Sequence, residues 1–217
     1  MILVVGATNS IGRAIMDQSE IYRIGVGRNK KIVHEMQNID GHCILRKSVE
    51  ELTIDENLLP GGRNIEDLEY IVFTHRYRPN ESEIYSMDNS FAVEVKHPIR
   101  ICREAANLCS KLKGILFVSS VASSHIAPEQ DISYHINKAS IEQSAKHLAI
   151  EFAKLDIAVN VLQLAYVKQP PKQRRAENYF KTSDIILPSG ITPTASEIAD
   201  LILHLLNLQM HPKPLMM

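Results

Sequence analysis

Short apolar runs that alternate with helical patterns most constrain the fold of this chain. Six runs rich in valine, isoleucine and leucine lie at residues 2–5, 23–27, 42–45, 69–74, 114–120 and 157–164. Such runs are typical of parallel strands that are buried on both faces of a sheet. Helical patterns lie at 11–19, 30–37, about 82–110, 132–154 and 195–207. The alternation predicts an α/β fold with a doubly wound parallel sheet between two layers of helices.

The composition is consistent with one domain over residues 1–217. Hydrophobic residues make up 45% of the chain, enough to bury a sizeable core without disulfides or metal. We find no internal repeat and no low-complexity tract. The acidic segment 48–67 is broken at Pro60-Gly61-Gly62, so it is predicted to be a surface excursion with a short helical turn.

Charge and residue usage exclude several classes of function. Lys and Arg total 24 against 25 Asp and Glu, and this balance argues against a nucleic-acid or membrane partner. No apolar run approaches the ~20 residues of a membrane span. Cys43, Cys102 and Cys109 lack zinc-site spacing and are expected to be reduced thiols in a cytoplasmic protein. The nine histidines show no ligand spacing beside a carboxylate, so no metal is expected.

The first predicted strand is followed by a glycine-containing loop, GATNSIG, at residues 6–12. A loop between a strand and a helix can place the N–H groups of the helix terminus against a pyrophosphate. Dinucleotide-binding loops usually carry three glycines, whereas this one has Gly6 and Gly12. Asn9 or Ser10 replaces the middle glycine: asparagine tolerates a left-handed backbone, and serine could donate to a phosphate. The loop predicts a dinucleotide site, and the alternative is a turn that binds nothing.

The segment after the second predicted strand bears on the choice of cofactor. A carboxylate at this place holds the ribose of NAD, and an arginine accommodates the 2′-phosphate of NADP. The sequence here is Gly27-Arg28-Asn29-Lys30-Lys31, without a carboxylate. Because Arg28 can hold a phosphate with two parallel hydrogen bonds, the pattern favours NADP, with NAD as the alternative. The segment could also be a solvated basic start to the next helix.

Candidate catalytic residues lie at and after the fifth predicted strand. That strand ends in Ser120, and SYHINKAS follows at residues 133–140. Tyr134 and Lys138 are four residues apart in a predicted helix, so they share one face. A free tyrosine has a pKa of about 10, too high for proton exchange at neutral pH, and a fixed ammonium group nearby favours the phenolate. The pattern predicts proton-transfer chemistry.

Five segments make the sequence similar to the short-chain dehydrogenase/reductase family over essentially its whole length. They are GATNSIG (6–12), GRN (27–29), VSS (118–120), YHINK (134–138) and VNVLQLAYVKQP (159–170). The resemblance implies a Rossmann-type fold and NADP(H)-dependent interconversion of a carbonyl and an alcohol by hydride transfer. In that family the tyrosine is the general acid/base, the lysine binds the nicotinamide ribose and the serine holds the substrate oxygen. By resemblance these roles fall on Tyr134, Lys138 and Ser120.

The resemblance also implies cofactor contacts and a partner. The implied cofactor contacts are Gly6, Thr8, Asn9, Ser10, Ile11, Gly12, Arg28, Asn29, Thr74, Tyr134, Lys138 and Val167. The family commonly forms homodimers through the helices that correspond to 82–110 and 132–154, and a homotetramer is the less secure alternative. Apolar positions that could form this interface, or else belong to the core, are Ile99, Ala106, Ile141, Ala145 and Leu148.

Several segments depart from the family pattern, and the following three bear on the site. Thr74-His75-Arg76-Tyr77 stands where the family has Asn-Asn-Ala-Gly, Glu94 where it commonly has the asparagine of a proton relay, and Gln169 where a threonine meets the carboxamide. Two functions therefore stay open: an active reductase of a small carbonyl compound, and a catalytically impaired NADP(H)-binding protein that acts as a sensor or interaction module. The loops around 121–133 and 166–194 are expected to select the substrate.

Overall fold

A six-stranded parallel sheet forms the centre of the computed structural model, which describes residues 1–18, 21–37, 41–55, 58–59, 63–78, 86–128, 130–168 and 192–207. The strands are β1 (Ile2–Val5), β2 (Arg23–Val26), β3 (His42–Leu45), β4 (Tyr70–Phe73), β5 (Gly114–Ser120) and β6 (Ala158–Leu164). Their order is β3-β2-β1-β4-β5-β6, which confirms the predicted doubly wound topology. The chain changes direction across the sheet between β1 and β4, and ligands of such folds bind at the carboxyl ends of the strands there.

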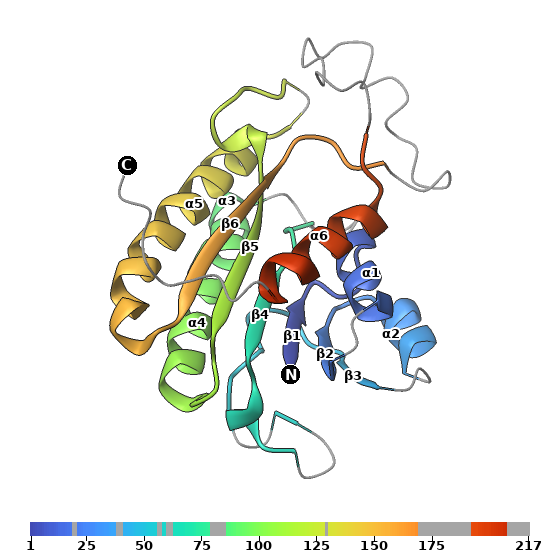
Figure 1. Ribbon diagram of the computed structural model, residues 1–217. Coiled ribbons are helices and arrows are strands. Elements are labelled where there is room, and N and C mark those ends of the chain that lie inside the picture. Colours follow the sequence, from blue (N-terminus) through green and yellow to red (C-terminus); the bar gives the residue numbers. More distant parts are fainter. Residues whose placement is uncertain are drawn as a thin grey trace.

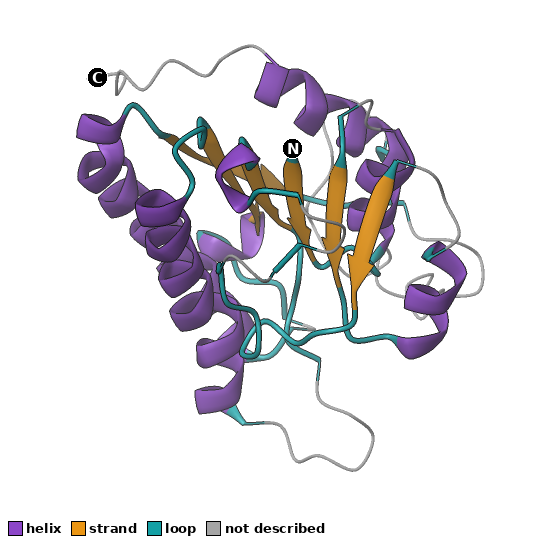
Figure 2. Cartoon of the chain, turned by 90° about the horizontal axis from the view of Figure 1, so that it is seen from below, coloured by secondary structure: helices purple, strands orange, loops and turns teal. Residues whose placement is uncertain are grey.

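Helices cover both faces of the sheet (Figures 1 and 2). One layer contains α1 (Ser10–Gln18), α2 (Lys30–Met36) and α6 (Ala195–Asn207). The other contains α3 (Met87–Phe91), α4 (His97–Leu108) and α5 (Ile132–Phe152). The three layers agree with the expected α/β/α architecture.

Alternating side chains of the strands supply two separate cores. In β1, Leu3 and Val5 belong to the cluster that packs against α4 and α5. Ile2 and Val4 belong to the cluster that packs against α1, α2 and α6. All four side chains are at most 2% exposed, because helices cover both faces of the strand. This double burial explains why the strand sequences are apolar throughout rather than alternating.

The long helix predicted over 82–110 is divided in the structure. It begins at Met87, after the N-cap Ser86, and the residues 79–85 lie outside the described part of the chain. A π-helical turn, η3 (Ala92–Lys96), separates α3 from α4 and contains Glu94. Turns of this type insert one residue into a helix and are frequent at functional sites.

The segment 48–67 is packed more closely than predicted. Its side chains Val49, Leu52, Ile54 and Ile65 are at most 7% exposed and belong to the core cluster beside α4 and α5. The expected short helical turn is η2, Ile65–Asp67. The prediction of a surface excursion is therefore wrong for these residues, since spaced apolar side chains in an acidic segment still enter the core.

Two of the three cysteines are buried as small apolar side chains. Cys102 and Cys109 are buried, Cys43 is half-buried, and all three are free thiols. Burial raises the pKa of Cys109 to about 11 and raises that of Cys102 further. Thiols with raised pKa values stay protonated and are poor nucleophiles. Separately, no helix in the described ranges is both long and apolar enough to cross a bilayer.

Candidate functional site

The glycine loop lies at the carboxyl end of β1, beside the end of β4 (Figure 1). Gly6 has φ of +97°, a left-handed conformation that favours glycine, and a Cβ there would lie 2.6 Å from the backbone nitrogen of His75. At Gly12 a Cβ would lie 2.3 Å from the carbonyl oxygen of Gly6. Both glycines are therefore required by the close packing of this turn.

Asn9 replaces the missing glycine in a way that the sequence did not predict. It does not adopt the left-handed conformation that we expected, because Asp156 is the one non-glycine residue with positive φ among those described. Its side-chain Nδ2 donates to the carbonyl oxygen of Thr74 at 2.7 Å, and its Oδ1 accepts from the N–H of Gly12 at 2.8 Å. The asparagine thus ties the loop to β4 and to the start of α1.

The remaining groups of this loop fit the phosphates of a dinucleotide. The Gly12 N–H is used by Asn9, but the first N–H groups of an α-helix have no acceptor within the helix. In α1 these belong to Ser10 and Ile11, and such groups favour anions together with the positive end of the helix dipole. Gly27 allows Thr8 to approach the end of β2, since a Cβ on Gly27 would lie 2.3 Å from Thr8 Cγ2. The loop and the Arg28 segment therefore lie side by side.

The other proposed cofactor residues have defined places around this loop. Arg28 is exposed, and its Nη2 donates to the carbonyl oxygen of Arg78 at 3.0 Å. Asn29 caps α2 by accepting from two backbone N–H groups. Thr74 is buried, with its Oγ1 3.2 Å from the carbonyl oxygens of Val5 and Gly6. Val167 is partly buried against the core cluster beside α1, whereas Gln169 lies outside the described residues.

Tyr134 and Lys138 lie on the same side of α5, as their spacing predicts. The Nζ of Lys138 is 5.5 Å from the centre of the Tyr134 ring. Lys138 also forms an ion pair with Glu94 of η3, with 3.3 Å between Nζ and Oε2. Both side chains of this pair are less than 10% exposed, so little water screens the interaction. The backbone N–H of Tyr77 donates to the other oxygen of Glu94 at 3.2 Å.

Arg76 covers the ring of Tyr134 from the end of β4. Its guanidinium carbon is 4.0 Å from the ring centre, closer than the Nζ of Lys138. Its Nη2 donates to Oε1 of Gln130, in the loop before α5, at 2.6 Å. The Arg76 side chain thus links the end of β4 to the loop after β5, and it passes over the predicted acid/base residue.

His75 lies beneath this site. Its Nε2 is 2.9 Å from the carbonyl oxygen of Val93, which precedes Glu94 in the π-helical turn. Burial of the ring lowers the pKa of His75 to about 4, so the ring is uncharged at neutral pH. The residue therefore helps to fix η3 without adding charge to the site.

Ser120 ends β5, the strand next to β4, and is partly exposed. Its Oγ accepts a hydrogen bond from the N–H of Ala122 at 3.3 Å. The preceding Ser119 points elsewhere, because its Oγ donates to Glu142 at 2.6 Å. Of the two serines, Ser120 is therefore the one whose hydroxyl can serve a substrate.

Two contacts of this site were not predicted from the sequence. The sequence marked Glu94 and Arg76 as departures from the family pattern, but it did not indicate that Glu94 pairs with Lys138 or that Arg76 stacks on Tyr134. The sequence does contain a sign of these contacts, because Glu94 and Arg76 are charged residues at places where the family pattern has uncharged ones. Which partner each side chain reaches depends on the backbone that carries it: the π-helical turn η3 for Glu94 and the segment after β4 for Arg76.

Comparisons with known proteins support the same family. A family model described as enoyl-(acyl carrier protein) reductase matches residues 73–210, more than half of the chain. None of the curated proteins matches the chain. Several solved structures resemble it at low sequence identity.

Three of these structures illustrate the likeness. The YIR035C short-chain dehydrogenase/reductase from Saccharomyces cerevisiae is 17% identical, with a TM-score of 0.73 over 95% of this chain and 90% of that one. The TT0495 protein from Thermus thermophilus is 22% identical, with a TM-score of 0.72 over 94% and 89%. BdcA in complex with NADPH is 17% identical, with a TM-score of 0.70 over 94% and 86%. At these identities the likeness shows the fold, and together with the family match we conclude that the chain belongs to the short-chain dehydrogenase/reductase family.

Proposed function

We propose that this chain is an NADP(H)-dependent oxidoreductase that interconverts a carbonyl and an alcohol on a small molecule, with Tyr134 as general acid/base. One observation carries the proposal. The glycine loop and Tyr134 are linked through the end of β4, because Asn9 bonds to Thr74 and Arg76, two residues later, stacks on the Tyr134 ring. The residues for cofactor binding and for proton transfer therefore share one site.

The cofactor would be held by groups that follow the ends of β1 and β2. The N–H groups at the start of α1 would bind its phosphates, and Arg28 would bind a 2′-phosphate. Among the described residues, Arg28 forms no ion pair with a carboxylate, so its positive charge is available to bind a phosphate. When bound, NADPH would supply a hydride to the carbonyl carbon.

The protein would move the proton that accompanies this transfer. Tyr134 would donate its phenolic proton to the carbonyl oxygen during reduction and take it back during oxidation. Ser120 would donate a hydrogen bond to the same oxygen and hold it near the tyrosine. Lys138, at 7% exposure, would hold the ribose of the cofactor. The stacked guanidinium of Arg76 would restrict the orientation of the Tyr134 ring.

Two charged residues that depart from the family pattern, Arg76 and Glu94, favour a second function, cofactor binding without catalysis. Arg76 covers one face of the Tyr134 ring, and Glu94 balances the charge of Lys138. If these contacts prevent proton transfer, the chain would bind NADP(H) without turnover and act as a sensor or interaction module. Binding and turnover measured separately distinguish the two functions.

Replacing Arg28 should separate NADPH from NADH. Arg28→Ala is expected to weaken NADPH binding about tenfold or more, the effect of losing a charge-assisted phosphate contact, and to leave NADH binding nearly unchanged. The measurement is a titration of cofactor fluorescence with each protein. Arg13→Ala is a suitable control, since Arg13 is an exposed arginine of α1 that pairs with Glu35. Equal losses for both cofactors in Arg28→Ala would contradict the assignment of NADP.

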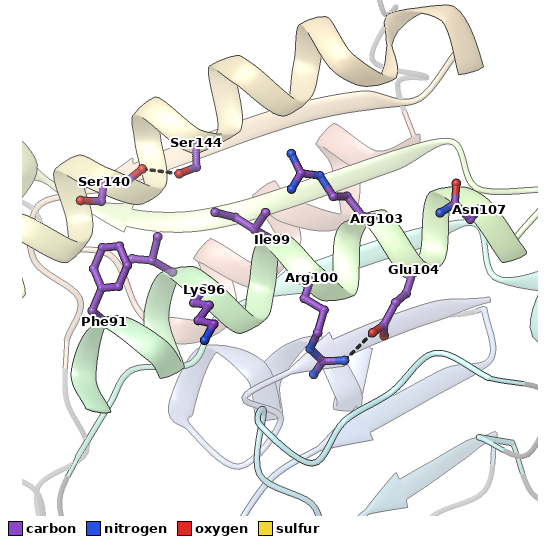
Figure 3. A pocket seen from close by; sticks show the side chains of 10 residues that line it. Phe91, Lys96, Ile99, Arg100, Arg103, Glu104, Asn107, Ser140 and Ser144 are labelled. Carbon is purple, nitrogen blue, oxygen red and sulfur yellow. Dashed lines mark hydrogen bonds and ion pairs between the residues drawn. The ribbon is translucent and has the colours of Figure 1, made fainter. Parts of the chain in front are cut away.

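A groove on the outer side of α4 and α5 supports the proposed homodimer (Figure 3). It has a volume of about 560 Å³ and includes Phe91, Val95 and Ile99 together with charged and serine side chains. Phe91 is 42% exposed, so its ring is accessible to a partner. Of the positions expected at this interface, Ile141, Ala145 and Leu148 are at most 4% exposed and belong to the chain's own core. We propose that a second copy covers Phe91 and Ile99 by isologous packing of these helices.

A charged residue in this groove should prevent the association. Phe91→Glu is expected to reduce the mass found by light scattering about twofold at micromolar concentration, because a dimer interface would have to bury an unpaired carboxylate. Leu201→Glu is the control, because Leu201 is similarly exposed at 40% but lies on α6 in the opposite helix layer. A parent protein that is already monomeric would contradict the dimer.

A further inference from the structure

The two cations beside Tyr134, Lys138 and Arg76, have different partners. Lys138 is balanced by Glu94, with 3.3 Å between Nζ and Oε2, and both side chains are buried. A buried carboxylate at this distance cancels most of the field of the ammonium group at nearby atoms. The Lys138–Glu94 pair therefore contributes little net charge to the surroundings of Tyr134.

Arg76 forms no ion pair with a carboxylate of the described residues. Its hydrogen bond goes to Gln130, whose amide is uncharged, and no ion pair of Arg76 occurs among the described residues. Its guanidinium carbon lies 4.0 Å from the centre of the Tyr134 ring, against 5.5 Å for the Nζ of Lys138. The nearest unbalanced cation at Tyr134 is thus supplied by the end of β4 rather than by α5.

A guanidinium on the ring face can act on the ionisation of a tyrosine. Cations are attracted to the face of a neutral aromatic ring, and the attraction increases when the ring carries the delocalised negative charge of a phenolate. The planar guanidinium suits such stacking better than an ammonium group does, and it stays charged at every pH of interest. The position of Arg76 therefore favours the ionised form over the neutral form.

We propose that Arg76 is the positioning residue that favours the phenolate of Tyr134 in this chain, and that Glu94 has removed this task from Lys138. The inference rests on the proposed function, since it concerns the acid/base residue of that reaction. Lys138 and Glu94 offset each other, and Arg76 supplies the cation that stacks on the tyrosine ring. Lys138 keeps its proposed role toward the cofactor ribose.

Other charged and titratable groups also lie around Tyr134. The charged and titratable groups of the surrounding segments are His75, Arg76 and Arg78 after β4, Glu94 in η3, and Asp131, His135 and Lys138 in and before α5. His75 is uncharged at neutral pH because burial lowers its pKa to about 4. His135 accepts a hydrogen bond at Nε2 from the N–H of Ala127. Asp131 accepts from the N–H of Ser133. Arg78 is exposed to solvent and also interacts electrostatically with Tyr134 and Arg76.

The test is the ultraviolet difference titration of Tyr134 in the protein without cofactor. Each protein is titrated together with its own Tyr134→Phe counterpart, so that the difference in phenolate absorbance reports Tyr134 alone. Arg76→Gln is expected to move the midpoint up by about one pH unit, because an adjacent cation is lost. Glu94→Gln should move it down, because the charge of Lys138 is then no longer balanced. Arg76→Lys should restore part of the effect, and intact circular dichroism spectra would show that the variants fold.

A second arginine–tyrosine stack provides the matched control. Arg63 lies 3.7 Å from the ring centre of Tyr22, at the start of β2, so Arg63→Gln removes an equivalent contact at another tyrosine. It should leave the Tyr134 titration unchanged. If Arg76→Gln also leaves the midpoint unchanged, or binds NADPH more tightly with an unchanged midpoint, Arg76 is only an obstruction and the inference is overturned. If the midpoint moves as expected but no substrate is reduced, the inference stands and the proposed catalytic function fails.

Discussion

Tyr134→Phe is expected to abolish carbonyl reduction while leaving NADPH binding within about twofold of the parent. The substitution removes one hydroxyl from a partly exposed ring, so it disturbs little packing. General acid/base catalysis by a positioned side chain is worth about 10²–10⁴-fold, and turnover should fall by that factor. The measurements are the rate of NADPH oxidation with a reducible substrate and the change of NADPH fluorescence on binding.

The control for this substitution is Tyr22→Phe, which removes the hydroxyl of a tyrosine that is also stacked by an arginine. It should leave turnover unchanged. A Tyr134→Phe protein that reduces the substrate as fast as the parent would contradict the assigned role. Unchanged NADPH binding in the same protein excludes unfolding as the reason for lost turnover.

Lys138→Met should have the largest effect on stability among the site residues. It leaves the carboxylate of Glu94 buried without its cation, and breaking a buried pair in this way costs about 3–5 kcal/mol of the free energy of unfolding. The same variant should also bind NADPH weakly and reduce substrate slowly, because the ammonium group that it lacks is also proposed to bind the cofactor ribose. Denaturation by urea measures the first effect, and fluorescence titration measures the second.

Two further variants separate the ion pair from other effects of the lysine. The double variant Lys138→Met with Glu94→Gln should recover most of the lost stability, because no charge is then left unpaired. Lys146→Met replaces an exposed lysine of the same helix and should change stability by less than about 0.5 kcal/mol. Equal losses in the single and double variants would show that the ion pair with Glu94 does not explain the effect.

Most of the fold could be predicted because local sequence patterns and the global packing agree. The runs at 2–5, 42–45 and 114–120 match β1, β3 and β5 at both ends. For β1 the reason is that a strand buried on both faces is apolar throughout. The last helix agrees at both ends as well. The π-helical turn at Ala92–Lys96 could not be predicted, because inserting one residue into a helix leaves no periodic signal.

The sequence predicted where the site residues lie along the chain, but it did not predict which side chains contact one another. The spacing of Tyr134 and Lys138 shows that they share a helix face, yet the partner of Lys138 comes from a distant turn. Asn9 was predicted to adopt a glycine-like backbone, whereas its amide bonds to Thr74 and Gly12 instead. Contacts between segments far apart in the sequence depend on tertiary packing, which no single stretch of the sequence encodes. The loop 169–191, expected to help select the substrate, lies outside the described residues.

The measurement that tests the proposed function most directly is isotope transfer from deuterated cofactor to product. The parent protein is incubated with NADPH that carries deuterium at the transferable position and with a panel of ketones, ketoacyl thioesters and keto-sugars. Mass spectrometry then follows the alcohol products. We expect one class of substrate to yield an alcohol that carries the deuterium on its carbinol carbon, with no transfer by the Tyr134→Phe protein. Tight binding of NADPH with no labelled alcohol from any substrate would contradict an oxidoreductase and favour the binding module.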